Sequence, residues 1–133
     1  MAVNAHEERA RNLARLAALQ KQLQKLAEAD LAETTRQREE LRGQIEHLLE
    51  VMSGLSELHR LFPHLYARQL GTLRSREQTL IGQAQLQEQK IVRERTKNER
   101  IGEHLADAKG EAERYQEDEA LLDLLELVKR PAP

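Results

Sequence analysis

Two histidines near the middle of the chain, His59 and His64, come nearest to metal chemistry by type and spacing. Zinc sites in proteins use three or four ligands, and the chain has no cysteine to complete such a set. We therefore expect no metal site.

A second cluster of chemically capable side chains is basic. Residues 93–100 hold four arginine or lysine side chains, which suit the phosphates of a nucleic acid. Two glutamates interrupt this run, and no glycine or aromatic residue is interleaved with it. The pattern therefore predicts a solvated helix face, and we expect no nucleic-acid partner.

The sequence contains no catalytic motif that we recognise. It has no phosphate-binding glycine loop, no nucleophile elbow and no HExxH helix. Carboxylates are numerous, but a pair of long helices offers no pocket that would desolvate them and shift their pKa values. We expect no catalytic residue and no cofactor, and we interpret the chain as a non-enzyme.

The composition favours long helices over a compact core. The 133 residues are 33% charged, and Phe62, Tyr66 and Tyr115 are the only aromatic residues. Large aromatic side chains supply much of the buried area of globular cores, whereas abundant Ala, Leu, Glu, Arg and Gln is typical of coiled coils. Intrinsic disorder is the competing interpretation for so polar a chain, but the regular leucine spacing argues against it.

Three observations predict a cytoplasmic location. The absence of cysteine fits a reducing compartment. No apolar run approaches the roughly 20 residues that a membrane-spanning helix needs, and residues 1–8 lack the features of a signal peptide. We expect a cytoplasmic protein.

Turn-forming residues gather at one place in the interior of the chain. Gly54 suits the left-handed position just past a helix end, and Pro63 suits the first turn of a new helix. We predict one coiled-coil domain over residues 1–133, with helices at about 7–53 and 63–129, a turn at 54–62 and a short tail at 130–133.

Apolar residues recur in steps of three and four along both predicted helices, as in a coiled coil. In the second helix the repeat runs without slippage from Tyr66 to Leu122. Polar residues interrupt this seam, and they either fix the register, mark a docking position or are solvated. The pattern predicts an all-α fold, a long antiparallel two-helix coiled-coil hairpin.

The first helix is less regular. A seam through Leu16, Leu19, Leu23 and Ala27 requires one stutter near Ala27, where the supercoil would locally unwind. Reversal of the chain near residue 58 would then set Met52 opposite His64 and Arg11 opposite Leu105. In that register Arg9, Arg11 and Arg15 face the acidic residues between 99 and 119.

The predicted register leaves residues beyond about 112 without a neighbouring helix. The densest apolar cluster of the chain lies there, and exposed apolar patches mark interaction sites. The alternatives are self-association and packing against a bent-back N-terminus. We predict a partner-binding surface on this segment, formed by Leu121, Leu122, Leu124, Leu125, Leu127 and Val128.

The opposite end of the hairpin holds two of the three aromatic residues. The apolar residues at this end either form a second partner-binding surface or cap the seam and close the hairpin; they are Leu58, Leu61, Phe62, Leu65 and Tyr66. Both interpretations are kept as predictions.

The sequence resembles the FliJ/YscO family, the stalk proteins of flagellar and virulence type III secretion. The similarity lies in the layout of two long helices, in residues 65–73 with the glutamine-rich stretch 77–89, and in the basic run 93–100 leading into the acidic region 103–119. The acidic, leucine-rich ending and the Pro-Ala-Pro tail have no counterpart that we can align with this family.

The resemblance implies a cytoplasmic, non-enzymatic stalk that links ATP hydrolysis to protein export. In this family the end with the helix termini enters a hexameric export ATPase, here Leu13, Leu16 and Leu19 with residues 121–128. The other end reaches the export-gate membrane protein, here near Phe62, Tyr66, Leu70 and Leu73, which would place the chain at the inner membrane through its partners. Some members also escort export chaperones.

Two other classes of function remain open at this point. A structural homo-oligomeric coiled coil would use the leucine-rich ending as its own dimer seam, and its mass in solution would reveal this. A small helical chaperone would instead bind client proteins and co-purify with them.

Overall fold

Two long helices make up nearly all of the structure, which is a computed structural model describing residues 4–54 and 62–129. Helix α1 spans Ala5–Ser53 and helix α3 spans Pro63–Lys129, with no strand in the described ranges. The all-α hairpin predicted from the sequence is confirmed. Both helices begin and end within two residues of the predicted bounds, while most of the predicted turn, 55–61, lies outside the described residues.

The described helix ends are satisfied by local hydrogen bonds. Asn4 caps α1, because its Oδ1 accepts a hydrogen bond from the backbone N–H of His6 at 2.9 Å. Pro63 is the first residue of α3, where its missing N–H costs no helical hydrogen bond. Gly54 donates its N–H to the carbonyl oxygen of Glu50 at 3.1 Å. Its φ is not positive, so the expected left-handed position at Gly54 is wrong.

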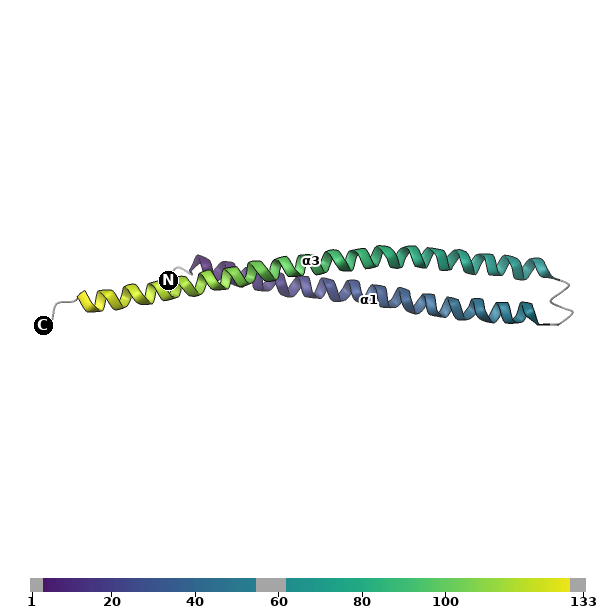
Figure 1. Cartoon of the computed structure of the whole chain (residues 1–133), viewed down its shortest axis with the longest axis horizontal. Coiled ribbons are helices and arrows are strands. Elements are labelled where there is room, and N and C mark those ends of the chain that lie inside the picture. Colours follow the sequence, from purple (N-terminus) through teal and green to yellow (C-terminus); the bar gives the residue numbers. More distant parts are fainter. Residues whose placement is uncertain (1–3, 55–61, 130–133) are drawn as a thin grey trace. The chain divides into compact units, whose positions relative to one another are not determined.

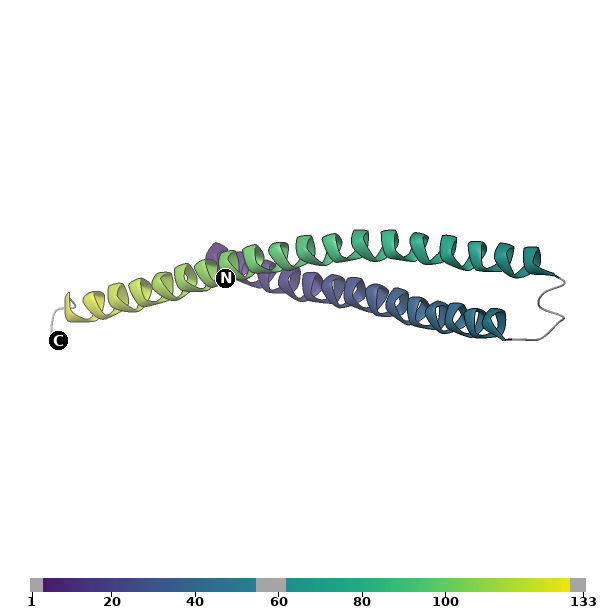
Figure 2. The same ribbon diagram turned by 45° about the vertical axis from the view of Figure 1, so that its right-hand side comes forward.

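The chain divides into two compact units, and each contains a stretch of both helices. One unit comprises residues 25–93, and the other comprises residues 1–24 together with 94–133. In each unit the described parts of α1 and α3 lie side by side and run in opposite directions (Figures 1 and 2). We describe them separately as the 25–93 unit and the terminal unit.

The 25–93 unit holds the apolar core. Leu41, Ile45 and Leu48 of α1 are buried against Leu73 of α3, and the partly buried side chains of Tyr66, Leu70 and Leu80 pack around this cluster. Full burial of one such aliphatic side chain contributes roughly 1.5–3 kcal/mol. The core therefore lies in the part of the hairpin nearest to the chain reversal.

The terminal unit has a thinner, more polar seam. Its buried apolar residues are alanines, Ala108 and Ala112, which are only 1% and 9% exposed. Gln20 and Glu94 are buried in the same unit. Because alanines add little apolar area, polar contacts carry more of the pairing here than in the 25–93 unit.

The seam of α3 follows the predicted repeat. Every predicted seam position from Tyr66 to Ala112 is buried or half-buried, whereas Tyr115, Glu119 and Leu122 are exposed. The seam prediction is therefore confirmed for α3 up to Ala112.

The seam of α1 departs from the prediction at its N-terminal end. From Ala27 to Leu48 the predicted positions are buried or half-buried, but Leu16, Leu19 and Leu23 are exposed. The residues that face α3 in their place are Leu13, Ala17, Gln20 and Gln24. These continue the 4–3 steps of the later seam without interruption, so the predicted stutter near Ala27 is wrong.

The register also differs from the prediction at the start of α1, where Arg11 lines a groove with Lys109 and Ala112. Gln116 donates a side-chain hydrogen bond to Glu7, and Leu16 lines the same groove as His104. The predicted pairing of Arg11 with Leu105 is therefore wrong. Arg9 does contact one of the expected acids, since its Nη1 lies 3.2 Å from Oε2 of Glu111.

Candidate protein-docking surfaces

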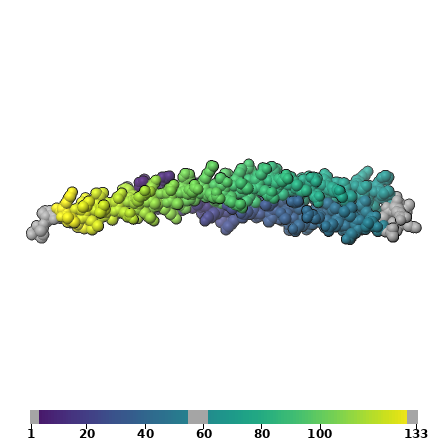
Figure 3. All heavy atoms as spheres, viewed as in Figure 1, coloured from purple at the N-terminus to yellow at the C-terminus, as the bar shows by residue number. Residues whose placement is uncertain are grey.

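The C-terminal segment of α3, residues 117–129, extends past the described start of α1. The contact between Glu7 and Gln116 is the last one between the two helices that the described residues record. All residues from 117 to 129 are exposed. In the space-filling view this end of α3, drawn in yellow, stands clear of the purple start of α1 (Figure 3).

This free segment carries an unusual amount of exposed apolar surface. Leu121 and Leu124 are 57% and 59% exposed, and Val128 is 81% exposed. A single helix covered with water on all sides gains nothing from such residues, so a patch of this kind marks an interaction surface. The full set of exposed apolar side chains is Leu121, Leu122, Leu124, Leu125, Leu127 and Val128.

The apolar face of the segment does not continue the seam between α1 and α3. Extended past Tyr115, the seam's steps lead to Glu119, Leu122 and Glu126, which are mostly polar. The apolar face, defined here as Leu121, Leu124, Leu125 and Val128, lies roughly 140° around the helix from that line, at 3.6 residues per turn. A longer α1 in the same register would leave this face uncovered, so the apolar face needs a different occupant.

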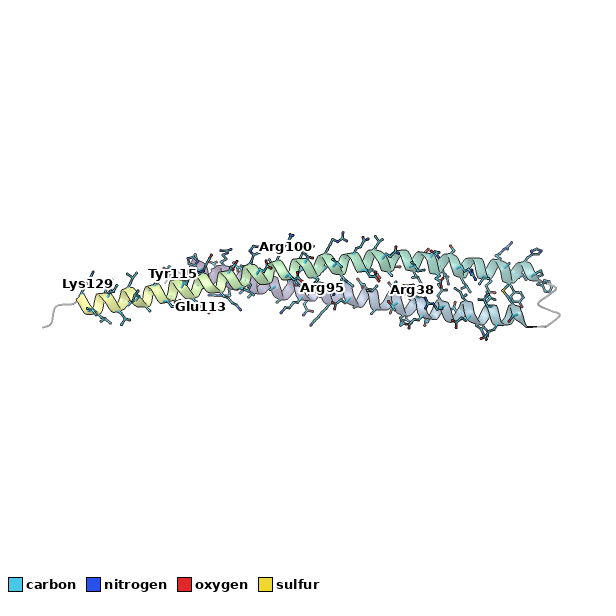
Figure 4. All side chains as sticks on the ribbon, in the orientation of Figure 1. Arg38, Arg95, Arg100, Glu113, Tyr115 and Lys129 are labelled. Carbon is cyan, nitrogen blue, oxygen red and sulfur yellow. The ribbon has the colours of Figure 1, made fainter. Side chains whose placement is uncertain are left out.

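The same segment is strongly acidic. Residues 115–128 contain five acidic side chains and no basic one. Tyr115 shares this environment, because a hydrogen bond from its hydroxyl to Glu119 and the negative charge of Glu119 raise the Tyr115 pKa above its ordinary value. Figure 4 labels Tyr115 and Lys129 on this part of α3. A protein that covers the apolar face must tolerate, or complement, this charge.

A second apolar surface lies on the N-terminal half of α1. Leu16, Leu19 and Leu23 are spaced by three and four residues, so they share one helix face. They are 46%, 57% and 45% exposed. We call these three residues the α1 leucine stripe.

Leu13 lies at the edge of this stripe and is half-buried. Together with Leu16 and His104 it lines an open groove of about 470 Å³ in the terminal unit. The sequence placed Leu13, Leu16 and Leu19 in one surface with residues 121–128. The structure instead separates them along the helix axis, because Leu16 lies level with His104, more than a dozen residues before Leu121.

At the other end of the hairpin, three of the four residues that the resemblance places near the export gate take part in packing. Leu73 is buried in the core cluster, and Tyr66 and Leu70 pack against it. Phe62 is 53% exposed. Most of this set therefore supports closure of the hairpin, which was one of the two interpretations; Phe62 alone of the four stays a candidate contact. The residues of this end that lie outside the described ranges are Leu58, His59 and Leu61.

Buried polar residues form a layer between the helices of the terminal unit. The Gln20 side-chain amide donates hydrogen bonds to the carboxylate of Glu94 and, at 3.4 Å, to its backbone carbonyl. One turn away, the side-chain amide of Asn98 donates to Oε1 of Gln24. Lys97 Nζ lies 3.5 Å from Oε1 of Glu94. These contacts fix the register, because a shift of either helix would leave buried polar groups without partners.

Two further polar atoms are buried in the 25–93 unit without a hydrogen-bond partner. They are Nε of Arg38, labelled in Figure 4, and Oε1 of Gln87. Both residues occupy seam positions, where an apolar side chain would be the more stable choice. These two positions therefore stabilise the pairing of the helices less than apolar seam residues would.

Among the described residues, the basic run is mostly exposed and the histidines gather no set of further metal ligands. Arg93, Arg95 and Arg100 are exposed, and Lys97 contacts Glu94. No group of three or more potential metal ligands occurs among residues 4–54 and 62–129. Within these same ranges, neither helix contains a stretch long and apolar enough to cross a membrane.

The fold and these surfaces define the chain as an antiparallel two-helix hairpin with exposed apolar faces. Comparison with protein-family models, curated proteins and solved structures found no match to this chain.

Proposed function

We propose that this protein is a non-enzymatic cytoplasmic adaptor that docks the free end of α3 into a partner protein. The partner we propose is the hexameric ATPase of a flagellar or virulence type III export apparatus, for which the chain acts as a stalk. Through its other end the stalk couples ATP hydrolysis to the export-gate membrane protein, and it also escorts export chaperones.

The observation that carries this proposal is the apolar face of residues 121–128. A helix that presents leucines on a free end suits insertion into an apolar groove, the mode by which amphipathic helices bind many partners. The acidic residues beside this face favour a groove with a basic rim. The layout of two unequal antiparallel helices, which resembles the FliJ/YscO stalks, supports the choice of partner.

The test is a binding titration of the full chain against a purified hexameric export ATPase, with ATP hydrolysis as a second readout. We expect the unaltered chain to bind and to stimulate hydrolysis. The variant L121S/L124S/L125S removes three exposed leucines, and we expect a loss of at least about tenfold in affinity. L86S is the matched control, because Leu86 is 67% exposed and lies on α3 far from the segment.

Two outcomes decide against the proposal. Equal ATPase binding by the triple variant and the unaltered chain removes residues 121–128 as the docking surface. Failure of the unaltered chain to bind any export ATPase removes the stalk function.

A further inference from the structure

The α1 leucine stripe and the apolar face of α3 have the same spacing. Leu16, Leu19 and Leu23 follow one another in steps of three and four, and so do Leu121, Leu124 and Val128. Side chains with matching 3–4 spacing form successive layers when two helices pack side by side. The two surfaces are therefore geometrically able to form one coiled-coil seam.

The two surfaces also carry opposite charge. Residues 9–24 contain four basic side chains and no acidic one, whereas residues 115–128 contain five acidic side chains and no basic one. Two copies of the acidic segment would repel each other, so a seam of segment against segment is disfavoured. Charge complementarity selects the α1 leucine stripe as the occupant of the apolar face.

The pairing cannot form within one molecule. Arg9 contacts Glu111, and seven residues farther along each of the two antiparallel helices Leu16 lies about level with His104. Helix α3 continues without a break to Lys129. At 1.5 Å per residue, Leu121 is then roughly 25 Å farther along the axis than the stripe it would have to cover. The segment can reach a leucine stripe only on a second copy of the chain.

The two-fold symmetry of a dimer requires a parallel pairing of the apolar face with the α1 leucine stripe, and the charges are compatible with that direction. In a parallel pairing that sets Leu121 beside Leu16, Glu117 and Asp118 lie level with the turn between Arg11 and Arg15. An antiparallel pairing also sets opposite charges level, Glu119 with Lys25 and Asp123 with Lys21, so charge alone does not select the direction. The parallel direction is the one produced when two hairpins overlap end to end about a two-fold axis.

We propose that two copies of this chain form a two-fold symmetric dimer, in which the apolar face of each α3 packs on the α1 leucine stripe of the other copy. The interface is isologous, because each copy contributes one acidic segment and one basic stripe. This dimer goes beyond the adaptor function and does not rest on it. It covers the leucines that a partner ATPase would bind, so partner binding and dimer formation compete.

The test is sedimentation equilibrium of the full chain alone, up to about 100 µM, a range that detects a micromolar dissociation constant. The unaltered chain sediments as a dimer that dissociates on dilution and in high salt. The variant L121S/L124S weakens the dimer at least tenfold. The variant L122S/L127S is its matched control, because it has the same composition and similar exposure but leaves the apolar face intact.

A second test of the dimer exchanges the charges of its two surfaces and is more specific than the leucine substitutions. The variants R11E/R15E and E117K/D118K alter residues that are exposed in the single molecule, so circular dichroism should show unchanged helix content. Each variant alone is a monomer, because its dimer would place like charges together. An equimolar mixture forms a heterodimer, because both of its interfaces regain opposite charges.

The proposal is overturned if the unaltered chain remains a monomer throughout the concentration range. It is also overturned if either charge variant dimerises alone as well as the parent, or if L122S/L127S weakens the dimer as much as L121S/L124S. A monomeric chain that still binds the export ATPase through residues 121–128 would overturn the dimer and leave the adaptor function standing. A chain that forms the dimer but binds no export ATPase would overturn the adaptor function and leave the dimer standing.

Discussion

The side-chain amide of Gln20 donates a hydrogen bond to the carboxylate of Glu94, and both residues are buried between α1 and α3. A buried carboxylate without a partner is costly, so this contact ties one register of the helices to a specific pair of residues. It explains why three leucines of α1 stay exposed while a glutamine takes a seam position.

Replacement of Gln20 alone should destabilise the hairpin. In Gln20→Leu the buried carboxylate of Glu94 loses this donor, and we expect a decrease in the free energy of unfolding of about 1–3 kcal/mol. The double variant Q20L/E94L should recover that loss, because an apolar pair of similar volume commonly replaces a buried polar pair without cost. Urea unfolding followed by circular dichroism measures both. The exposed substitution Gln22→Leu is the control, and a Q20L variant as stable as the parent would contradict the role of this pair.

A cluster of exposed charges on α1 gives a prediction about pKa. Hydrogen bonds from Arg36 and Gln37 hold the Glu33 pKa below its ordinary value of 4.5. We expect Arg36→Ala to raise this pKa back toward 4.5, whereas Arg42→Ala should leave it unchanged. Nuclear magnetic resonance titration of the Glu33 side chain measures the shift.

The same pair sets the sign of a small pH dependence. The pKa of Glu33 is lower in the folded chain than in the unfolded chain. The interaction of Glu33 with Arg36 therefore stabilises the fold above pH 4.5, and this contribution is lost as the pH falls through the folded-state pKa. Both partners are exposed, so the effect on unfolding should be slight. A Glu33 pKa that is the same in R36A and in the parent would rule out this interaction in solution.

Two glycines inside the helices should accept alanine with a gain in stability. An added Cβ would meet no atom within 4 Å at Gly43 or at Gly102. Each Gly→Ala substitution should therefore raise the free energy of unfolding by about 0.5–1 kcal/mol, because alanine restricts the unfolded chain more than glycine. Thermal unfolding should show additive increases in Tm. A decrease for either variant would mean that its site is more crowded in solution than in the structure.

Enlarging a buried alanine of the terminal unit should instead lower the free energy of unfolding. Ala108 is only 1% exposed, so leucine at this position would have to push the helices apart. We expect Ala108→Leu to cost about 1–3 kcal/mol. The exposed Ala120→Leu is the control and should be nearly neutral. An A108L variant that is as stable as A120L would show that the helices do not approach closely there.

The sequence was sufficient to predict the hairpin, both helix ranges and the seam of α3, because a repeat that runs from Tyr66 to Ala112 leaves little choice of face. It was not sufficient for the start of α1. There two helix faces could have formed the seam, one with Leu16, Leu19 and Leu23 and the other with Gln20 and Gln24. The leucine face is the more apolar one, so the sequence predicts the wrong face. The seam includes the glutamines because Glu94 and Asn98 on the opposite helix supply their hydrogen bonds.

A signal for the correct face was present in the sequence. Continued backward from Ala27, the 4–3 steps of the later seam pass through Gln24, Gln20, Ala17 and Leu13. The sequence predicts the free segment 121–128 and a binding role for Leu16 and Leu19. It does not predict that these two leucines form, with Leu23, a stripe separate from that segment, because all three also fit the expected seam.

The position of the apolar core has a consequence for how the chain folds. Leu48 and Leu73 meet after only about 25 intervening positions, whereas Gln20 and Glu94 are 74 apart in sequence. Closing the longer loop first would cost about 1 kcal/mol more in chain entropy and would gain only a thin, polar contact. Folding should therefore nucleate around Leu48 and Leu73 and propagate toward the chain termini. Amide hydrogen exchange should be slowest around this nucleus and fastest at the start of α1 and the end of α3, so the surfaces that we assign to binding belong to the part of the molecule that opens most easily.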